Sequence, residues 1–443
     1  MYCRFRIIHS IMLNKLAQEL NEILDGTAAK ILFSDLGNRM YFPKGIIAQG
    51  AEAKKRAKTA NGTIGMTVVN GTPSILPSVH KYAPSLTSRE LVAYAPTAGL
   101  PELREIWKTK QLEKNPLLKN KKTSLPAVVP GLTAGLSLIA DLFVDKNKPL
   151  LAPNPSWDNY PLIAETRRGA EFHTFPMFAD GTFNLAGLEN AVNSEAEKYG
   201  SVRLLLNFPQ NPSGYSPTSN EVAEICRIIK NAAENGAKLL VISDDAYFGL
   251  SYEDDIESQS LFAHIVDIHE NVLAVKADGP TKEDFAWGFR CGFLTFACKG
   301  FTDAQYDALL KKLMGAIRSS ISCSSTPSQS IILKALAEPS IEQEKLELFN
   351  MLKARYKAVR KFVDGRKSGA LEALPFNSGY FMSFTMHGID AEELRSRLLN
   401  ESGIGTISID SKTLRVAFSS IDEDKIESVY EKIYTTAEEL ARA

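Results

Sequence analysis

Three apolar runs in the middle of the chain end in polar residues that could carry out chemistry. One run leads into a rigid, proline-rich turn, in which the amide of Asn211 could donate to a ligand oxygen. The next ends in Asp244 and Asp245, and Tyr247 lies close enough along the chain to reach the same ligand as Asp244. Two adjacent carboxylates could instead cap a helix, or one could be buried against a cation. Ligands of open α/β sheets bind at the carboxyl ends of strands, so these residues are candidates for a site.

The third run leads to two cations, Lys282 and Arg290, which lie eight residues apart. Lys282 follows a Gly-Pro turn, and Arg290 lies between Gly288 and Gly292, whose lack of side chains permits close approach of a ligand. A single lysine is ordinarily a solvated surface charge. The functional interpretation therefore depends on its neighbours.

Two further stretches could hold an anion. Gly131, Leu132 and Thr133 follow a predicted strand and open a predicted helix, which is a suitable place for a phosphate. This stretch matches neither the dinucleotide fingerprint nor a P-loop. Arg415 lies inside the apolar strand predicted over Thr413–Phe418, where it either faces solvent or binds a carboxylate bidentately.

Composition excludes several classes of protein. The 51 Lys and Arg residues balance 52 Asp and Glu residues, which argues against a nucleic-acid partner. No apolar run approaches about 18 residues, so no membrane-spanning helix is expected. The five cysteines have no CxxC spacing and the six histidines form no HxH or HExxH pattern. We therefore expect a reducing, cytoplasmic location and no metal site.

The strands and helices that position these residues can be predicted from the hydrophobic pattern. Apolar runs alternate with amphipathic stretches, which is typical of a parallel sheet covered by helices on both faces. Strands are predicted at Ala127–Val129, Pro149–Ala152, Glu171–Phe175, Val202–Asn207, Lys238–Ser243, Asn271–Val275 and Gly292–Phe296. Helices are predicted at Thr133–Phe143, Leu185–Lys198, Thr218–Asn235 and Ser258–Asp267.

The two ends of the chain differ from this middle part. Residues 13–60 predict one amphipathic helix and then an irregular segment. Residues 1–11 are interpreted either as the product of an upstream start codon or as a disordered lead, with Met12 beginning the chain proper. After the long charged helix predicted at Ile341–Lys367, strands and helices mix as in a small α+β domain. Its further elements are predicted at Tyr380–Met386, Ala391–Leu399, Thr413–Phe418 and Asp422–Leu440.

Taken together and in order, the chemistry-bearing residues resemble the class I and II aminotransferases, which are pyridoxal-phosphate enzymes of fold type I and include the aspartate aminotransferases. The resemblance extends from about Gly65 to Arg415. The motifs that carry it are Tyr94-Ala95-Pro96-Thr97-Ala98-Gly99, running on to Leu103 and Arg104; Pro155-Ser156-Trp157; Asn211-Pro212-Ser213-Gly214; Asp244 with Tyr247; and Lys282 followed by Gly288, Arg290 and Gly292.

The resemblance implies an α/β fold with a large domain, whose mostly parallel seven-stranded sheet is sandwiched by helices, and a small α+β domain. We expect residues 1–60 to be a helix and segment associated with the small domain, 61–340 to be the large cofactor-binding domain and 341–443 the small domain. It also implies a homodimer with shared active sites that transfers the amino group of an L-amino acid to a 2-oxo acid.

The resemblance assigns roles around the ring of pyridoxal 5'-phosphate. Lys282 would hold the cofactor aldehyde as a Schiff base and later shuttle the proton. Asp244 would pair with the pyridine nitrogen, and Trp157 would stack on the ring. Tyr247 and Asn211 would hydrogen-bond the phenolic oxygen.

Phosphate and substrate contacts are implied in the same way. Leu132, Thr133 and Arg290 would hold the phosphate, together with Tyr94 from a second subunit. Substrate binding is expected at Arg415, Asn211, Gly65 and Arg318. Two departures from the family pattern suggest a divergent subgroup, namely Gly279 where serine is common and Leu132 where small or polar residues are frequent.

The donor and the reaction stay open at this point. Arg318 in an Ile-Arg segment before a serine-rich loop resembles the arginine that binds the distal carboxylate in aspartate aminotransferases, or it simply favours the carboxyl end of a helix. Aspartate, glutamate or an aromatic amino acid could be the donor. The same fold also supports carbon–sulfur β-lyases, decarboxylases and non-catalytic aminotransferase-like regulators. The last of these usually carry an additional DNA-binding domain, of which the first 60 residues show no sign.

Overall fold

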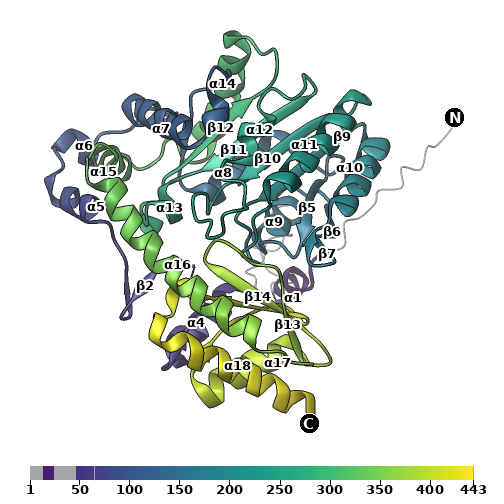
Figure 1. The fold of residues 1–443 in the computed structure, drawn as a ribbon. Helices are drawn as coiled ribbons and strands as arrows, with labels where there is room; N and C mark the ends of the chain where they lie inside the picture. Colours follow the sequence, from purple (N-terminus) through teal and green to yellow (C-terminus); the bar gives the residue numbers. More distant parts are fainter. Residues whose placement is uncertain (1–12, 24–45, 64, 443) are drawn as a thin grey trace.

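The computed structural model describes residues 13–23, 46–63 and 65–442 and is built around a seven-stranded sheet (Figure 1). Its strand order is β4-β12-β11-β10-β9-β5-β6, and all strands are parallel except β12, which is antiparallel to β11 and β4. The mostly parallel seven-stranded sheet expected from the sequence is therefore confirmed. Its strands are β4 (Ala127–Val129), β5 (Leu150–Asn154), β6 (Phe172–Pro176), β9 (Ser201–Asn207), β10 (Lys238–Asp244), β11 (Val272–Asp278) and β12 (Gly292–Ala297).

Helices cover both faces of this sheet, and the alternation of side chains along each strand shows which helix covers which face. Leu204 and Val241 pack into a core with helices α10 (Leu185–Tyr199), α11 (Ser219–Glu234) and α12 (Leu261–Ile265). Their neighbours Leu205 and Ile242 belong to the opposite core, which includes α8 (Leu132–Phe143). Continuous apolar strands are thus buried on both sides, as in other parallel sheets.

The helix boundaries follow from local sequence. Helix α11 begins after Thr218, whose hydroxyl accepts the Glu221 backbone N–H while the Glu221 carboxylate accepts from the Thr218 N–H. This capping box satisfies donors that a helix start leaves free. Other helices around the sheet are α5 (Pro77–Tyr82), α6 (Ser88–Val92), α7 (Pro101–Lys114), α9 (Asn159–Pro161), α13 (Pro280–Glu283), α14 (Asp303–Ser320) and α15 (Thr326–Leu336).

The C-terminal part of the chain forms a second sheet, to which the long helix α16 (Ile341–Gly365) leads (Figure 1). This sheet has the order β13-β14-β17-β16, with strands Leu371–Ala373, Phe381–Met386, Thr413–Ala417 and Ile407–Asp410, respectively. Helices α17 (Ala391–Ser402) and α18 (Glu423–Arg442) pack with it. Strands β13 and β16 were not predicted, because they are short and contain polar residues, unlike the comparably short but wholly apolar β4.

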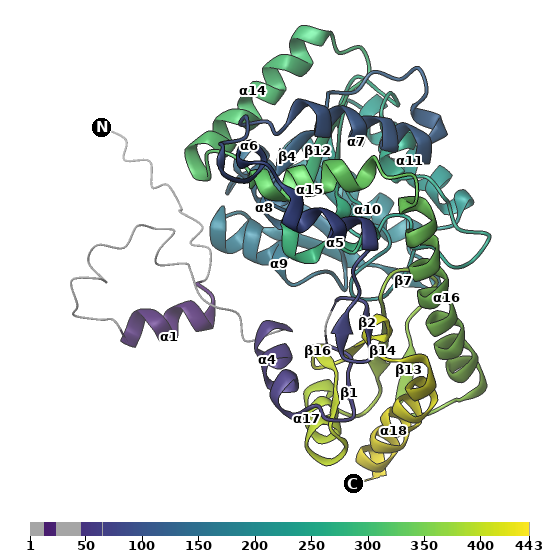
Figure 2. The same ribbon diagram turned by 90° about the vertical axis from the view of Figure 1, so that its left-hand side faces the viewer.

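An early segment joins this C-terminal part. Strand β1 (Ala60–Asn61) pairs in parallel with β15 (Ile404–Gly405), and α4 (Ile46–Arg56) packs beside β15 and β16 (Figure 2). The segment was expected to be irregular, so α4 corrects that prediction, whereas α1 (Lys15–Ile23) lies within the predicted first helix. Residues 1–12 and 24–45 lie outside the described residues. No helix of the described stretches is both long and apolar enough to cross a bilayer.

Candidate active site

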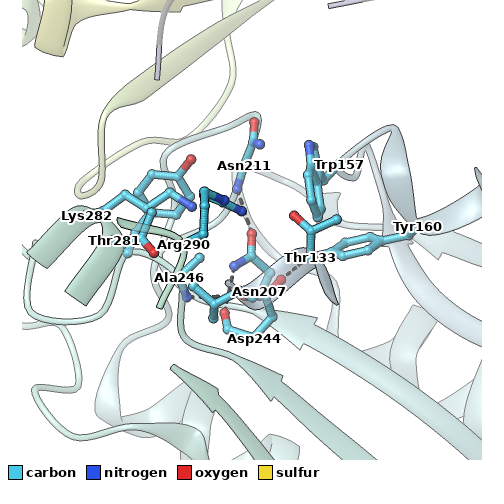
Figure 3. A pocket seen from close by; sticks show the side chains of 12 residues that line it. Thr133, Trp157, Tyr160, Asn207, Asn211, Asp244, Ala246, Thr281, Lys282 and Arg290 are labelled. Carbon is cyan, nitrogen blue, oxygen red and sulfur yellow. Dashed lines mark hydrogen bonds between the residues drawn. The ribbon is translucent and has the colours of Figure 1, made fainter. Parts of the chain in front are cut away.

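A pocket lies at the carboxyl ends of β9 and β10, where the amino end of α8 also points (Figure 3). It is lined by eight residues singled out in the sequence: Leu132, Thr133, Trp157, Asn211, Asp244, Tyr247, Lys282 and Arg290. These residues come from loops and strand ends up to 158 positions apart, so only the sheet brings them together. Four further lining residues were not predicted: Tyr160, Asn207, Ala246 and Thr281.

Asp244 is the carboxylate that faces the pocket. Its Oδ2 accepts a hydrogen bond of 2.6 Å from the hydroxyl of Tyr160, and its Oδ1 accepts one of 3.2 Å from the backbone N–H of Ala246. Burial raises the pKa of Asp244, while the Tyr160 hydroxyl and the Lys282 charge oppose the rise. The carboxylate therefore lies ready for a cationic partner inside the pocket.

Asp245 points to the other side of the strand and does not line the pocket. It accepts hydrogen bonds from Ser243 and Ser260 and forms an ion pair with Lys276. The pair is almost fully buried, with 1% of the Lys276 side chain and 2% of the Asp245 side chain exposed. The sequence left open whether these carboxylates cap a helix or whether one is buried against a cation. For Asp245, the structure shows burial against a cation.

Lys282 lies on the short helix α13, and its amine is 4.7 Å from the centre of the Tyr247 ring. Burial lowers the pKa of Lys282 to about 8, Asp244 acts to raise it, and Arg290 lowers it further. A substantial fraction of this amine is neutral near pH 7.4, about one fifth for a pKa of 8. Neutral amines are the nucleophilic form, so this lysine is poised to attack a carbonyl.

Arg290 lies against the amino end of α8. A Cβ atom at Gly131 would come within 2.5 Å of Arg290 Nη2, so a side chain there would displace the guanidinium from the helix start. Gly131 has φ +87°, which favours glycine as well, and no side chain caps the helix after it. The free N–H groups of this helix start, Arg290 and the nearby Thr133 form a cationic corner of the pocket that fits a phosphate.

Arg415 is buried rather than solvent-facing, with 2% of its surface exposed. Its Nη1 donates to Asn211 Oδ1 at 2.9 Å and its Nη2 to the Thr63 carbonyl at 3.2 Å, and its guanidinium lies 4.2 Å from the Phe381 ring centre. Burial lowers its pKa to about 10. Among the residues that the structure describes, none accepts from its Nε. The guanidinium therefore has donor capacity left for a carboxylate.

The other substrate candidates differ in position. Gly65 is next to the pocket, since a Cβ atom there would be 3.8 Å from the Tyr247 hydroxyl and 3.1 Å from Phe381. Tyr94 is 93% exposed and does not line the pocket of its own chain. Arg318 is also exposed at the carboxyl end of α14, where it hydrogen-bonds the Ser322 hydroxyl. Within one chain, the structure does not bring Tyr94 or Arg318 to the site.

The unpredicted lining residues hold the predicted ones in place. Asn207 donates from Nδ2 to the Asp244 carbonyl at 2.7 Å, and its Oδ1 accepts the Asn211 backbone N–H at 2.9 Å. Asn207 could have been predicted as a site residue, because it ends β9 and pairs in register with Asp244 at the end of β10. The role of Tyr160 had no comparable signal, because its loop and Asp244 are 84 residues apart.

Two other sequence observations bear on the site. A Cβ atom at Gly279 would come within 3.0 Å of the Cys291 carbonyl and of the Gly292 Cα, so the neighbouring main chain occupies the place of the family's serine. Among the residues described, no group of three or more His, Cys, Asp or Glu side chains could hold a metal ion.

Comparison with known proteins gives the family. The family description "Aminotransferase class I and II" matches residues 66–433. A probable aspartate/prephenate aminotransferase of Aquifex aeolicus is 31% identical over 161 residues, 36% of this chain and 38% of the relative. An aromatic-amino-acid aminotransferase of Thermococcus litoralis is 26% identical over 219 residues, 49% of this chain and 52% of the relative. The alignments thus span about two fifths to one half of these two curated relatives.

Solved structures show the same fold. A crystal structure of an aminotransferase from Anaerococcus prevotii superposes with a TM-score of 0.81 at 23% identity, covering 91% of this chain and 99% of that one. The expected fold type I architecture is therefore confirmed.

Proposed function

The chain belongs to the aminotransferase class I and II family, and from this premise we propose that it is a pyridoxal-phosphate-dependent aminotransferase. The proposal rests above all on one observation: a buried lysine whose pKa is lowered to about 8 shares a pocket with a buried carboxylate and a cationic corner. Lys282, Asp244 and Arg290 supply these three groups, and each suits one part of the cofactor.

The residues present fit pyridoxal phosphate. The helix start at Leu132 and Thr133, with Arg290, would hold the phosphate, and Lys282 would hold the aldehyde carbon. Asp244 would pair with the protonated ring nitrogen, with Trp157 beside the ring face. When bound, the cofactor supplies an electron sink for carbanion character at the substrate Cα.

The chain's own residues would do the remaining work. Arg415 and Asn211 would bind the substrate carboxylate, since Arg415 is buried, contacts Asn211 and donates from Nε to none of the residues in the described part of the chain. This orients the amino acid so that its Cα proton faces the Lys282 amine. With a pKa near neutrality, that amine can take up the proton and return it during one turnover. The hydroxyl of Tyr247 would bind the phenolic oxygen of the cofactor.

We propose that the active enzyme is a cytoplasmic homodimer with shared sites. Tyr94 supports this, because its ring is 93% exposed in one chain although the family motif assigns it to a phosphate. Arg318 is likewise exposed and would reach a substrate only in a neighbouring subunit. If it does so, the donor has a second carboxylate, as in aspartate or glutamate. We also propose the domain division expected from the sequence: residues 61–340 form the large cofactor-binding domain, 341–443 form the small domain, and 1–60 associate with the small domain.

One experiment tests the function directly. The purified protein loaded with pyridoxal phosphate is mixed with a panel of L-amino acids while the visible absorbance of the bound cofactor is followed. We expect the donor to bleach this absorbance and a 2-oxo acid to form in equal amount, with the absorbance restored by a 2-oxo acid acceptor. Release of ammonia with a thiol, or of carbon dioxide, would instead identify a β-lyase or a decarboxylase.

A further inference from the structure

The turn that carries Lys282 is held by a residue far along the chain. The hydroxyl of Tyr380 donates to the main-chain carbonyl of Lys282 at 2.8 Å. The local backbone offers this carbonyl the N–H of Asp284 and, at 3.4 Å, the N–H of Phe285. Burial raises the pKa of Tyr380 far above its ordinary value, so the hydroxyl keeps its proton and acts as a donor. The Lys282 carbonyl is therefore held by its own turn and also by a hydroxyl from beyond the large sheet.

Tyr380 is itself held firmly. The residue before it, Gly379, donates its N–H to the Leu250 carbonyl at 2.8 Å, and its carbonyl accepts from the Tyr252 hydroxyl at 2.8 Å. The Tyr380 ring packs edge-on against the ring of Tyr247, with centres 5.4 Å apart. The phenol that holds the turn is thus in contact with the same tyrosine against which the Lys282 amine lies.

A second contact reaches the turn from helix α16. The amine of Lys345 is 2.9 Å from Asp284 Oδ1 and 3.7 Å from Glu283 Oε1, the two residues that follow Lys282. The Lys345 side chain is 11% exposed and that of Asp284 is 2% exposed. Lys114 of α7 also pairs with Glu283. Breaking a buried pair leaves an uncompensated charge, so this contact constrains where residues 283 and 284 can lie.

We propose that Tyr380 and Lys345 are positioning residues for Lys282. Tyr380 fixes the carbonyl of Lys282 and Lys345 fixes the two carboxylates after it, so the lysine amine is held at the Tyr247 ring and near Asp244. Both residues lie in the part of the chain that carries the substrate-binding candidate Arg415. The inference rests on the proposed function only where turnover is concerned, because the position of the amine can be measured without it.

The test compares Tyr380→Phe with Tyr306→Phe. Both changes remove one hydroxyl that donates to main-chain carbonyls, but Tyr306 binds the carbonyls of Lys122 and Cys298, far from Lys282. In the cofactor-free protein, the pKa of the Lys282 amine is measured from the pH dependence of its acetylation, read by peptide mass spectrometry. In the loaded enzyme, kcat and KM are measured with the donor found above.

We expect Tyr380→Phe to raise the pKa of the Lys282 amine by roughly 0.5 to 1 unit, because an amine that is held less tightly becomes better hydrated. We expect kcat to fall about tenfold with KM within about twofold, since the amine acts in the chemical step. Tyr306→Phe should alter neither quantity. The same pKa and kcat in Tyr380→Phe as in the unaltered protein would overturn the proposal.

Variants of Lys345 test the proposal independently, because their outcome does not depend on whether Tyr380→Phe folds. Lys345→Met should raise the pKa of the Lys282 amine, as Tyr380→Phe does. Lys345→Arg keeps a cation near Asp284, so the pKa of the Lys282 amine should return most of the way to its value in the unaltered protein. If Lys345→Arg is as perturbed as Lys345→Met, or neither is perturbed, Lys345 is not a positioning residue. A protein with the expected shifts in amine pKa but no transamination would refute the proposed function alone.

Discussion

Adjacent carboxylates in one strand allow the site and the stability of the protein to be perturbed separately. Asp244 faces the pocket, whereas Asp245 is buried with Lys276 on the other side. We predict that Asp244→Asn abolishes most of the turnover and leaves stability nearly unchanged. Asp245→Asn should do the reverse. Each substitution keeps the shape of the side chain, removes its charge and replaces one accepting oxygen with an amide donor, so the two variants share the same chemical change.

The magnitudes follow from what each carboxylate contacts. Removing one partner of a buried ion pair costs about 3–5 kcal/mol, and Asp278 at 3.6 Å still gives Lys276 some compensation. We therefore expect Asp245→Asn to lose about 3 kcal/mol of unfolding free energy. Asp244→Asn removes the negative charge proposed to face the ring nitrogen. A loss of about 3 kcal/mol of transition-state stabilisation corresponds to a turnover roughly 100-fold lower.

Unfolding by urea and turnover of the folded protein measure the two effects. The double variant Asp245→Asn with Lys276→Met is the control, because removing both charges spares the protein an unpaired cation. Asp278 then loses its cation but keeps its hydrogen bonds from Trp107 and Gln111, so part of the lost stability should return. If Asp245→Asn reduces turnover of the folded protein more than Asp244→Asn does, the assignment of the two carboxylates is wrong. If the double variant is no more stable than Asp245→Asn, the ion pair is not the cause of the loss.

The remaining predictions concern Lys282, Arg290, Tyr94 and Arg318. Borohydride reduction of the loaded enzyme should label Lys282, and Lys282→Ala should fold without label or transamination; a label on another lysine would refute the assignment. Arg290→Gln removes a cation that lowers the pKa of Lys282, so in the cofactor-free protein the amine should titrate above about 8, and an unchanged or lower pKa would contradict the electrostatics. Mixed Tyr94→Phe and Lys282→Ala subunits should regain activity, because each hybrid dimer has one intact site; verified exchange without recovery would argue against shared sites. Arg318→Ala should lower kcat/KM for aspartate and glutamate at least about tenfold and spare other amino acids, whereas an equal loss for all donors would assign Arg318 to structure.

The large sheet could be predicted because its signals are local in sequence. Each long strand is a continuous apolar run bounded by turns, and the predicted ends of Val202–Asn207 and Lys238–Ser243 differ from the observed strands by one residue. The local sequence does not indicate that β12 is antiparallel, because the direction of a strand depends on which edge of the sheet the preceding connection reaches. Short strands such as β1, β13 and β15 were missed because a period of two cannot be recognised over so short a run, whereas the three residues of β4 were recognised as a continuous apolar run.

The site was partly predictable for a similar reason. Motif spacing identified eight residues that the structure brings together in one pocket, but not the residues that hold them. Tyr160 and Tyr380 contact Asp244 and the Lys282 turn across 84 and 98 positions of sequence, respectively. Such contacts depend on how loops from separate elements meet. A tyrosine in an apolar stretch gives no indication of which distant group its hydroxyl will reach.

Lys276 and Lys282 show how placement decides the chemistry of one residue type. Both are buried near the end of β11, six positions apart. Burial acts to lower the pKa of each. At Lys276 the carboxylates of Asp245 and Asp278 outweigh burial and raise its pKa, so this amine stays charged and pairs structurally.

At Lys282, within the described part of the chain, the carboxylate of Asp244 acts to raise the pKa and Arg290 opposes it, so burial prevails and the pKa falls to about 8. Near pH 7.4 about one amine in five is then neutral, against about one in a thousand at the ordinary pKa of 10.5. Burial alone therefore does not make a lysine reactive. The lysine proposed to react, Lys282, is the one whose surroundings supply too little negative charge to hold its proton firmly.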